Sequence, residues 1–448
     1  MPSMTDMLTF EAAAARFRQA SLTPRDYLEQ AIAIIQEKED RVRAFACLDL
    51  DRARAQADAA TERYRRQAPL SAIDGMPVGI KDIIDTATLP TTMGSDIYRG
   101  WQPAADAEAV DAIRLGGGII LGKTHTTEFA IGRATVTTNP HDATRTPGGS
   151  SSGTAAAVAS GMICAGLGTQ TQGSIVRPAS YCGVAGYKPT WGVLPLRGVH
   201  PVSSSHDHLG VIAQSLDTAW TTARCIMHYR PTPASAQLDS RSTPALEARP
   251  AGRVAVLRTQ GYAELDADAL RAFDAQLDNW RRAGAVLVEP GDDPHLAALC
   301  HDLDQIPSLS QELVSHDMRW PYWSYCQQHP QAISRKIHDM VEAGLKITPQ
   351  RYAGVCAMRD GILARLEALA SHYDAFMLPA ASGVAPVGLD NTGSRTLLVY
   401  GSFLGIPALS LPVLQVGHMP LGIQLLGPRF SDHPLLCHGK WLVSLAGT

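Results

Sequence analysis

One stretch, residues 148–189, constrains this chain more than any other. It reads GGSSSGTAAAVASGMICAGLGTQTQGSIVRPASYCGVAGYKP, so clusters of glycine, serine and threonine stand on both sides of an alanine-rich run of helical length. Such clusters usually form turns, and two ordinary loops are the plain interpretation. Because the clusters bracket one helix, we expect two turns that face each other across a single site, where backbone N–H groups can hold an oxyanion.

A serine nucleophile in this stretch needs a base, and the stretch contains no histidine. The nearest histidines are His125, His200, His206 and His208. A Ser–His–Asp triad stays open, because its members can lie anywhere in a sequence. The other candidate is Lys81, at the end of the apolar, strand-like run 76–80, where burial would lower the pKa of the amine and make it a base. A structural Lys81 that pairs with Asp82 or reaches solvent is the alternative.

Several motifs, in one order along the chain, resemble the signature of the amidase signature family of serine hydrolases. They are GMPVGIKD at 75–82, GGSSSG at 148–153, GTQTQGS at 168–174, CGVAGYKPT at 182–190, GIPA at 405–408 and PLGIQ at 420–424. In motif the chain is most similar to malonamidase-like members and to small-molecule amidases and urethanases. The resemblance implies a single α/β/α sandwich around a mixed, largely parallel sheet. It also implies a Ser–cis-Ser–Lys triad, with no cofactor and no metal.

Carried over residue by residue, the resemblance places the nucleophile on Ser174, the bridging serine on Ser150 and the lysine on Lys81. Ser150 is preferred to its neighbours because its spacing to Ser174 agrees with the family pattern, and the peptide bond before it is expected to be cis. The oxyanion hole is expected from the backbone N–H groups of Thr171, Gln172, Gly173 and Ser174. Substrate-binding residues are expected at Gly149, Ser151 and Arg177. In malonamidase-like members an arginine at the place of Arg177 grips a substrate carboxylate; a structural arginine is the alternative.

Two glutamines depart from the common family pattern. Gln170 stands where many members have aspartate, and Gln172 stands where the family almost always has glycine. If the backbone at Gln172 needs a positive φ, its side chain costs about 1 kcal/mol or more. The side chain is also expected to crowd the oxyanion hole or to form a hydrogen bond there. These effects of Gln172 would change the rate and the acyl groups that the enzyme accepts, and would leave the class of reaction unchanged.

The pattern of apolar runs predicts an α/β fold in one domain, residues 1–448. Residues 1–68 are expected to form helices that pack on the domain; Thr23, Pro24 and Asp26 mark one helix start. Residues 252–257, 267–283 and 286–289 predict strand, helix and strand, and 375–379, 407–412 and 421–427 predict buried strands. Residues 231–252 are expected to be a surface excursion. Residues 296–355, with aromatics at 320–325, are expected to be a variable region that shapes the substrate pocket.

A second motif suggests a different class of protein. The residues from Gly117 to Thr124 (GGIILGKT) match the phosphate-loop pattern GxxxxGK[ST]. A phosphate loop follows a strand, whereas Ile119, Ile120 and Leu121 are themselves strand-like. A nucleotide-binding protein is therefore the alternative that we regard as unfavoured.

Composition limits the partners. Lysine and arginine number 39 and aspartate and glutamate 43, so the net charge of -4 provides no field for nucleic acid or a membrane surface. Eight cysteines include no CxxC pair, which argues against a zinc ribbon or disulfide framework and suits a reducing cytoplasm. No signal peptide and no run of 18 apolar residues is present, so neither secretion nor membrane insertion is expected.

These observations predict a cytoplasmic hydrolase that cleaves the C–N bond of a small amide, anilide or carbamate through a serine acyl-enzyme. It is expected to work without nucleic acid or membrane, alone or as a homodimer. The alternative within the same fold is the A-type subunit of a glutamine-dependent amidotransferase, which needs a partner chain and a transfer RNA.

Overall fold

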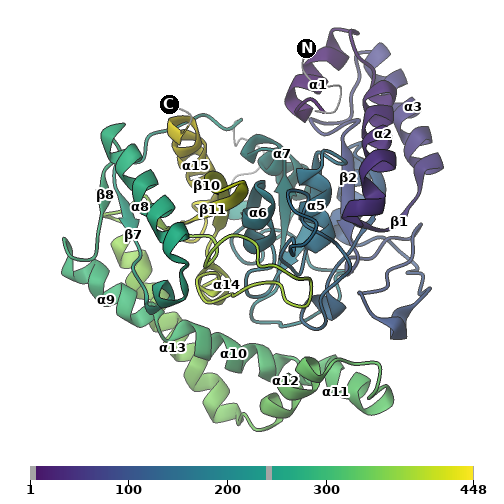
Figure 1. The fold of residues 1–448 in the computed structure, drawn as a ribbon. Helices are drawn as coiled ribbons and strands as arrows, with labels where there is room; N and C mark the ends of the chain where they lie inside the picture. Colours follow the sequence, from purple (N-terminus) through teal and green to yellow (C-terminus); the bar gives the residue numbers. More distant parts are fainter. Residues whose placement is uncertain (1–6, 239–244, 447–448) are drawn as a thin grey trace.

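The computed structural model describes residues 7–238 and 245–446 (Figure 1). Eleven strands form one sheet in the order β1-β3-β2-β4-β6-β5-β10-β11-β9-β7-β8. The strands are β1 (Phe45–Leu48), β2 (Pro77–Lys81), β3 (Ile119–Thr124), β4 (Ala165–Gln170), β5 (Ala185–Lys188), β6 (His208–Ala213), β7 (Val254–Val256), β8 (Leu287–Val288), β9 (Ala375–Pro379), β10 (Ala408–Val416) and β11 (Met419–Leu426). Every strand predicted above from an apolar run is present.

Fifteen α-helices accompany the sheet in the described residues. They are α1 (Phe10–Arg18), α2 (Pro24–Val42), α3 (Leu50–Arg65), α4 (Glu108–Leu115), α5 (Ser152–Ala159), α6 (Val176–Cys182), α7 (Leu216–Tyr229), α8 (Ala267–Arg282), α9 (Pro294–Leu303), α10 (Ile306–Asp317), α11 (Arg319–Gln328), α12 (Arg335–Leu345), α13 (Pro349–Leu369), α14 (Val399–Phe403) and α15 (Asp432–Ala446). Short 3₁₀ turns lie at Asp96–Tyr98, Glu128–Ala130, Ser235–Leu238 and Gln260–Glu264.

The sheet is mixed, as predicted, but it is not largely parallel. Among the described strands, β2 runs parallel to β3 and β4, and β7 runs parallel to β8 and β9. The other six neighbouring pairs are antiparallel. The longest antiparallel pair shows why. β10 and β11 are joined by a two-residue turn with Gly417 at φ 61°, and such a short turn can join only antiparallel strands, because parallel neighbours need a long crossover connection.

Helices cover both faces of the sheet, because successive side chains of a strand point to opposite sides. Along β3, Ile119 and Leu121 lie in the core formed with α2, α3 and α5, whereas Ile120 lies in the core that includes α4 and α7. A third core joins α9, α10, α13 and α14 to β7 and β9. The predicted α/β/α sandwich is therefore present, with α10 to α13 projecting beyond the sheet at the bottom of Figure 1.

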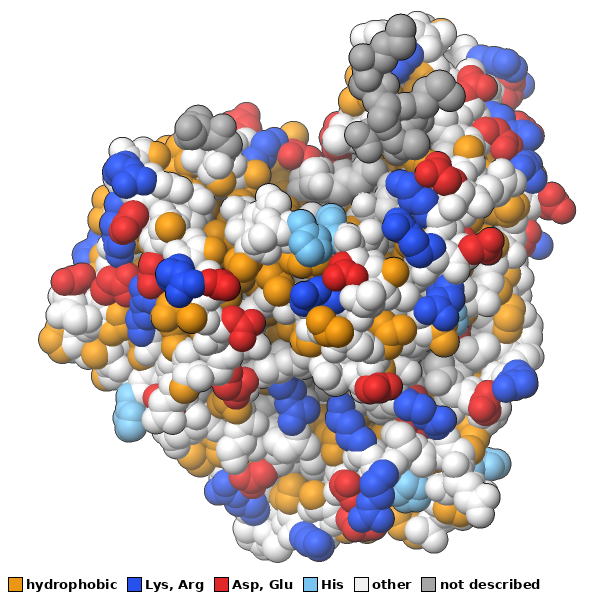
Figure 2. All heavy atoms as spheres, in the orientation of Figure 1, with side chains coloured by type: hydrophobic (Ala, Val, Ile, Leu, Met, Phe, Trp, Pro, Cys, Tyr) orange, Lys and Arg blue, Asp and Glu red, His pale blue; other side chains and the backbone are white. Residues whose placement is uncertain are grey.

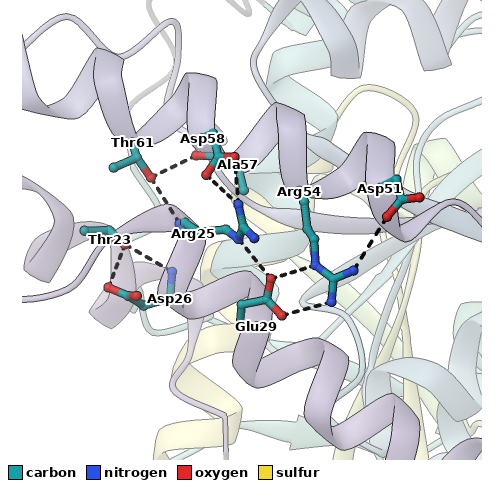
Figure 3. A network of polar contacts seen from close by, with 9 residues as sticks. All are labelled: Thr23, Arg25, Asp26, Glu29, Asp51, Arg54, Ala57, Asp58 and Thr61. Carbon is teal, nitrogen blue, oxygen red and sulfur yellow. Dashed lines mark hydrogen bonds and ion pairs between the residues drawn. The ribbon is translucent and has the colours of Figure 1, made fainter.

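The N-terminal segment is helical apart from one strand that the sequence did not predict. β1 pairs with the edge of β3, between α2 and α3. The predicted start of α2 is confirmed: Asp26 N donates to Thr23 Oγ1 (3.1 Å), and Thr23 Oγ1 donates to Asp26 Oδ2 (2.7 Å). Exposed ion pairs then join α2 to α3, with Arg54 on Glu29 (2.8 Å) and Arg25 on Asp58 (2.7 Å) (Figure 3). Pairs this exposed each add little stability.

The phosphate-loop pattern has a structural explanation. Its last six residues form β3, and Lys123 is fully buried, with its ammonium 3.1 Å from Asp82 and donating to Thr91 Oγ1 (2.6 Å). Lys123 therefore belongs to the interior of the sheet and not to a loop that could hold phosphate.

Two features of the surface complete the fold. Basic and acidic side chains are interspersed on the face drawn in Figure 2, as the small net charge leads one to expect. None of the described helices is both long and apolar enough to cross a membrane. Residues 1–6 and 239–244, which belong to the predicted N-terminal helical segment and the predicted surface excursion, lie outside the described residues.

Candidate active site

The three predicted catalytic side chains come from neighbouring elements. β2 and β4 run parallel beside each other, so the carboxyl ends of both strands meet at one edge of the sheet. Lys81 is the last residue of β2, and the turn that carries Ser174 follows β4 directly. Ser150 lies just before α5, which packs against both strands. The backbone N–H of Ser151 donates to Ser174 O (3.3 Å), so the two glycine- and serine-rich turns face each other as predicted.

Lys81 is fully buried and is held by hydroxyl groups. Its Nζ donates to Ser150 Oγ (2.8 Å) and Thr169 Oγ1 (2.7 Å), with Thr169 O at 3.4 Å. No carboxylate forms an ion pair with it among the described residues; Asp82 pairs with Lys123 instead. Burial is the main cause that lowers the pKa of Lys81 well below its ordinary value, opposed by the charge of Asp207. The structure thus favours a neutral amine beside Ser150 over a snorkelling or ion-paired lysine.

The peptide bond between Gly149 and Ser150 is cis, as the family resemblance implies. The buried guanidinium of Arg177 binds the carbonyl oxygen of Gly149 through Nη2 (2.6 Å) and Nε (3.1 Å). Its Nη1 donates to the carbonyl oxygens of Gly393 (2.8 Å) and Ser394 (3.3 Å). Arg177 therefore holds two backbone segments around the site, and its binding of a substrate carboxylate stays a prediction.

The turn before α6 exposes backbone N–H groups. Those of Thr171, Gln172, Gly173 and Ser174, the four expected above, donate to no backbone acceptor among the described residues. Gln170 fixes the turn, because its Oε1 accepts from Ile175 N (2.9 Å) and from the N–H of the next residue (3.1 Å). Free N–H groups held in a rigid turn can stabilise a developing oxyanion.

Gln172 does not have the strained backbone considered above. It is not among the described residues with positive φ. Its side chain also makes hydrogen bonds away from the free N–H groups: Nε2 donates to Ser310 Oγ on α10 (3.0 Å), and Oε1 accepts from Arg395 Nη1 (2.8 Å). Gln172 therefore links the turn to α10 and to the loop before α14.

A cavity of about 390 Å³ opens at these groups, and we call it the Ser174 cavity. Its lining includes Ser150 and Ser174, together with Thr127, residues 130–132, Gln172, Gly173, Arg177, Lys336 and residues 392–396. None of the histidines in residues 7–238 and 245–446 lines it, which disfavours a Ser–His–Asp triad. The cavity is of the size that holds a small molecule.

Other predicted substrate contacts lie outside this lining. The carbonyl of Gly149 is taken by Arg177, and Ser151 Oγ donates to Thr169 O (3.3 Å); binding of substrate by these two residues stays a prediction. The aromatics of 320–325 lie elsewhere too: Trp320 is 73% exposed, and Tyr325 stacks on Phe129 at 5.3 Å.

Sequence reasoning missed four residues of the site. Thr169 holds Lys81, and Asp207 anchors the turn by accepting from Thr171 Oγ1 (2.7 Å). Burial raises the pKa of Asp207 to about 6. Lys336 on α12 and Arg395 before α14 line the cavity from segments more distant in sequence. Of these four residues, only Thr169 could have been found from the sequence, because it lies in the GTQTQGS motif directly before Gln170.

Comparison with known proteins decides the family, because the family model "Amidase" matches residues 26–436. The chain belongs to the amidase family. The predicted resemblance is thereby confirmed, while the finer likeness to malonamidase-like members stays a prediction. As an amidase, the protein hydrolyses the carbon–nitrogen bond of amides.

Relatives of this amidase have several descriptions. It is 38% identical to the A-type subunit of glutamyl-tRNA(Gln) amidotransferase from Anaeromyxobacter sp. (strain K), over 96% of this chain and 94% of that protein. It is 30% identical to AtzE of Pseudomonas sp. (strain ADP), described as a 1-carboxybiuret hydrolase subunit, over 93% of this chain and 94% of that one. A crystal structure described as an amidase superposes with a TM-score of 0.84 at 28% identity, covering 98% of this chain and 99% of the other.

Proposed function

We propose that this amidase hydrolyses a small amide, anilide or carbamate through an acyl-enzyme on Ser174. The observation that carries the proposal is the buried Lys81 amine, 2.8 Å from Ser150 Oγ and without a carboxylate partner among the described residues. A buried, neutral amine is a base available at neutral pH, which a serine nucleophile requires.

In the proposed reaction, Ser174 Oγ attacks the carbonyl carbon and forms a C–O bond. The Ser174 proton passes to Ser150 Oγ as the Ser150 proton passes to Lys81 Nζ. The carbonyl oxygen becomes an oxyanion near the N–H groups of Thr171, Gln172, Gly173 and Ser174. When the C–N bond breaks, the relay returns a proton to the leaving nitrogen. Water then attacks the acyl ester by the same relay, releasing the acid and restoring Ser174.

Acylation is the direct test. An activated aryl ester mixed with the enzyme and quenched in acid should give an intact mass increased by the acyl group, and peptide mapping should place that group on Ser174. Ser174→Ala should give no adduct and no turnover. Ser394→Ala, which removes another hydroxyl of the Ser174 cavity, should still be acylated. An adduct of unchanged yield on Ser174→Ala would refute the assignment of the nucleophile.

Overall similarity favours a second candidate, the A-type subunit of a glutamine-dependent amidotransferase. The supporting observation is the 38% identity to such a protein over nearly the whole of both chains. A chain with this function should hydrolyse glutamine in preference to other amides, and should co-purify with further subunits. The relative described as part of a 1-carboxybiuret hydrolase supports the hydrolase instead. Kinetics with glutamine and with a panel of small amides separate the two candidates.

A further inference from the structure

The Ser174 cavity carries positive charge without a matching negative charge. Arg177, Lys336 and Arg395 line it, and none of the described aspartates or glutamates does. Within the described residues none of the three cations forms an ion pair. Charges inside proteins are ordinarily paired, because removing an ion from water costs free energy that only a counter-charge or hydrogen bonds recover; this cost falls on the buried Arg177 and the half-buried Arg395, and not on the exposed Lys336.

The three cations differ in what they have left to offer a ligand. Four of the five N–H groups of Arg177 donate to backbone carbonyl oxygens, as described above. Arg395 is half-buried and donates from Nη1 to Gln172 (2.8 Å) and from Nη2 to Gln311, so three of its five N–H groups have no acceptor among the described residues. Lys336 is exposed and has no hydrogen-bond partner in the described parts of the chain. Its pKa is lowered by surrounding protein first and then by the charges of Arg395 and Arg177.

Two carboxylates close to the cations in the fold already have partners. Glu264 accepts from the hydroxyl groups of Ser394 (2.5 Å) and Thr396 (2.8 Å), on either side of Arg395. Asp339 lines a neighbouring hollow that Lys336 and Arg395 also border, and it pairs with Arg335 at 2.7 Å. Two oriented amides, and not an acid, therefore hold the Arg395 guanidinium at the cavity.

We propose that the Ser174 cavity selects amides that carry a carboxylate, which Arg395 and Lys336 bind while the amide carbonyl lies at Ser174. Gln172 positions Arg395 and so takes part in this selection, which explains why a glutamine is useful at a place where glycine is the family's common residue. The inference rests on the proposed function of Ser174. It adds the class of substrate, amides that carry a carboxylate, and assigns the recognition of that carboxylate to Arg395 and Lys336.

The same chemistry separates this substrate class from free glutamine. Glutamine carries a carboxylate and also an ammonium, which needs an acceptor or a counter-charge when it leaves water. The lining of the Ser174 cavity offers cations where such an ammonium would require a carboxylate. Glutaramate, which is glutamine without its amino group, should therefore be the better substrate.

The test compares pairs of amides that differ by one charge. Succinamate and succinamide differ only in a carboxylate against a carboxamide of nearly the same shape. We expect wild-type kcat/KM for succinamate to exceed that for succinamide by about 10- to 100-fold, the range for a hydrogen-bonded charge pair. Glutaramate should likewise exceed glutamine. Equal rates within either pair, or a preference for the uncharged amide or for glutamine, would overturn the inference.

Variants then assign the preference to residues. Arg395→Met and Lys336→Met should lower kcat/KM for succinamate about 10-fold or more beyond any loss with succinamide, mainly through KM; Gln172→Leu should have a smaller effect in the same direction. Arg335→Met is the control, because it removes a neighbouring charge that points to Asp339 and does not line the cavity. Equal losses on both substrates, or an equal effect of the control, would refute a specific role.

Binding to an inactive variant keeps this inference separate from the mechanism. Calorimetry of Ser174→Ala with succinate and glutarate should show binding that Arg395→Met abolishes in the same background. If these dicarboxylates bind but Ser174→Ala still hydrolyses amides, the proposed nucleophile fails and the recognition site stands. If Ser174 is acylated by an aryl ester but neither dicarboxylate binds, the recognition site fails and the nucleophile stands.

Discussion

Replacing Lys81 with methionine removes the proposed base and keeps most of the side-chain volume. The amine has two side-chain partners, Ser150 Oγ and Thr169 Oγ1, in a site closed to solvent. Their loss costs about 0.5–1.5 kcal/mol each, and relief of the buried polar amine offsets part of it. We therefore expect the free energy of unfolding to stay within about 2 kcal/mol of the wild-type value.

The effect on catalysis should be much larger and should depend on the leaving group. Lys81 is proposed to accept the Ser174 proton and later to return a proton to the leaving nitrogen. An amide needs both steps, whereas an activated aryl ester expels phenolate without a proton and needs only the first. Each proton transfer is worth about 10²–10⁴-fold. Lys81→Met should therefore lose about that factor more activity on an anilide than on the matched aryl ester.

The assay is kcat/KM for the matched anilide and ester over a range of pH. In the wild type, activity should fall as the pH drops through the pKa of Lys81, because protonation removes the base, and burial sets that pKa below the ordinary value. The acidic limb should be absent from the residual ester hydrolysis of Lys81→Met. Thr169→Val keeps the amine and should slow both substrates alike. Equal losses of Lys81→Met on both substrates would refute the double role.

Three further predictions concern the residues around this relay. Ser150→Ala should add little to the loss already caused by Ser174→Ala, measured as single-turnover rates, since the triad acts as a unit. Arg177→Met should lower the free energy of unfolding in denaturant titrations by about 1–3 kcal/mol for each carbonyl left unpaired, that of Gly149 first; an unchanged value would contradict its structural role. Asp207 has a pKa raised to about 6, so its folded form holds a proton more tightly than its unfolded form, and its contribution to stability declines as the pH rises from about 4 to 6. Asp207→Asn should flatten that part of the stability–pH curve; an unaltered slope would show that another group titrates there.

The sequence by itself determined the parts of the protein that depend on local chemistry. Glycine and serine clusters on both sides of a helix-sized run predicted two facing turns, and Thr23 with Asp26 predicted the start of α2. The apolar runs predicted strands because a buried strand is apolar along its length. The family motifs identified Lys81, Ser150 and Ser174 as candidate catalytic residues, because each motif is a continuous segment that can be recognised without knowing the fold.

The tertiary structure decided those features that arise only when segments distant in the sequence come together. Strand direction is one case, because β1 and β6 could pair with partners in either sense until the whole sheet was assembled. The charge of the cavity is another case. Lys336 and Arg395 belong to no sequence motif, and their importance is visible only in the fold, where no described acidic side chain lines the same cavity. Gln172 shows the difference most directly. Its sequence position suggested crowding of the oxyanion hole, whereas the fold supplies partners on α10 and before α14 that draw its side chain away.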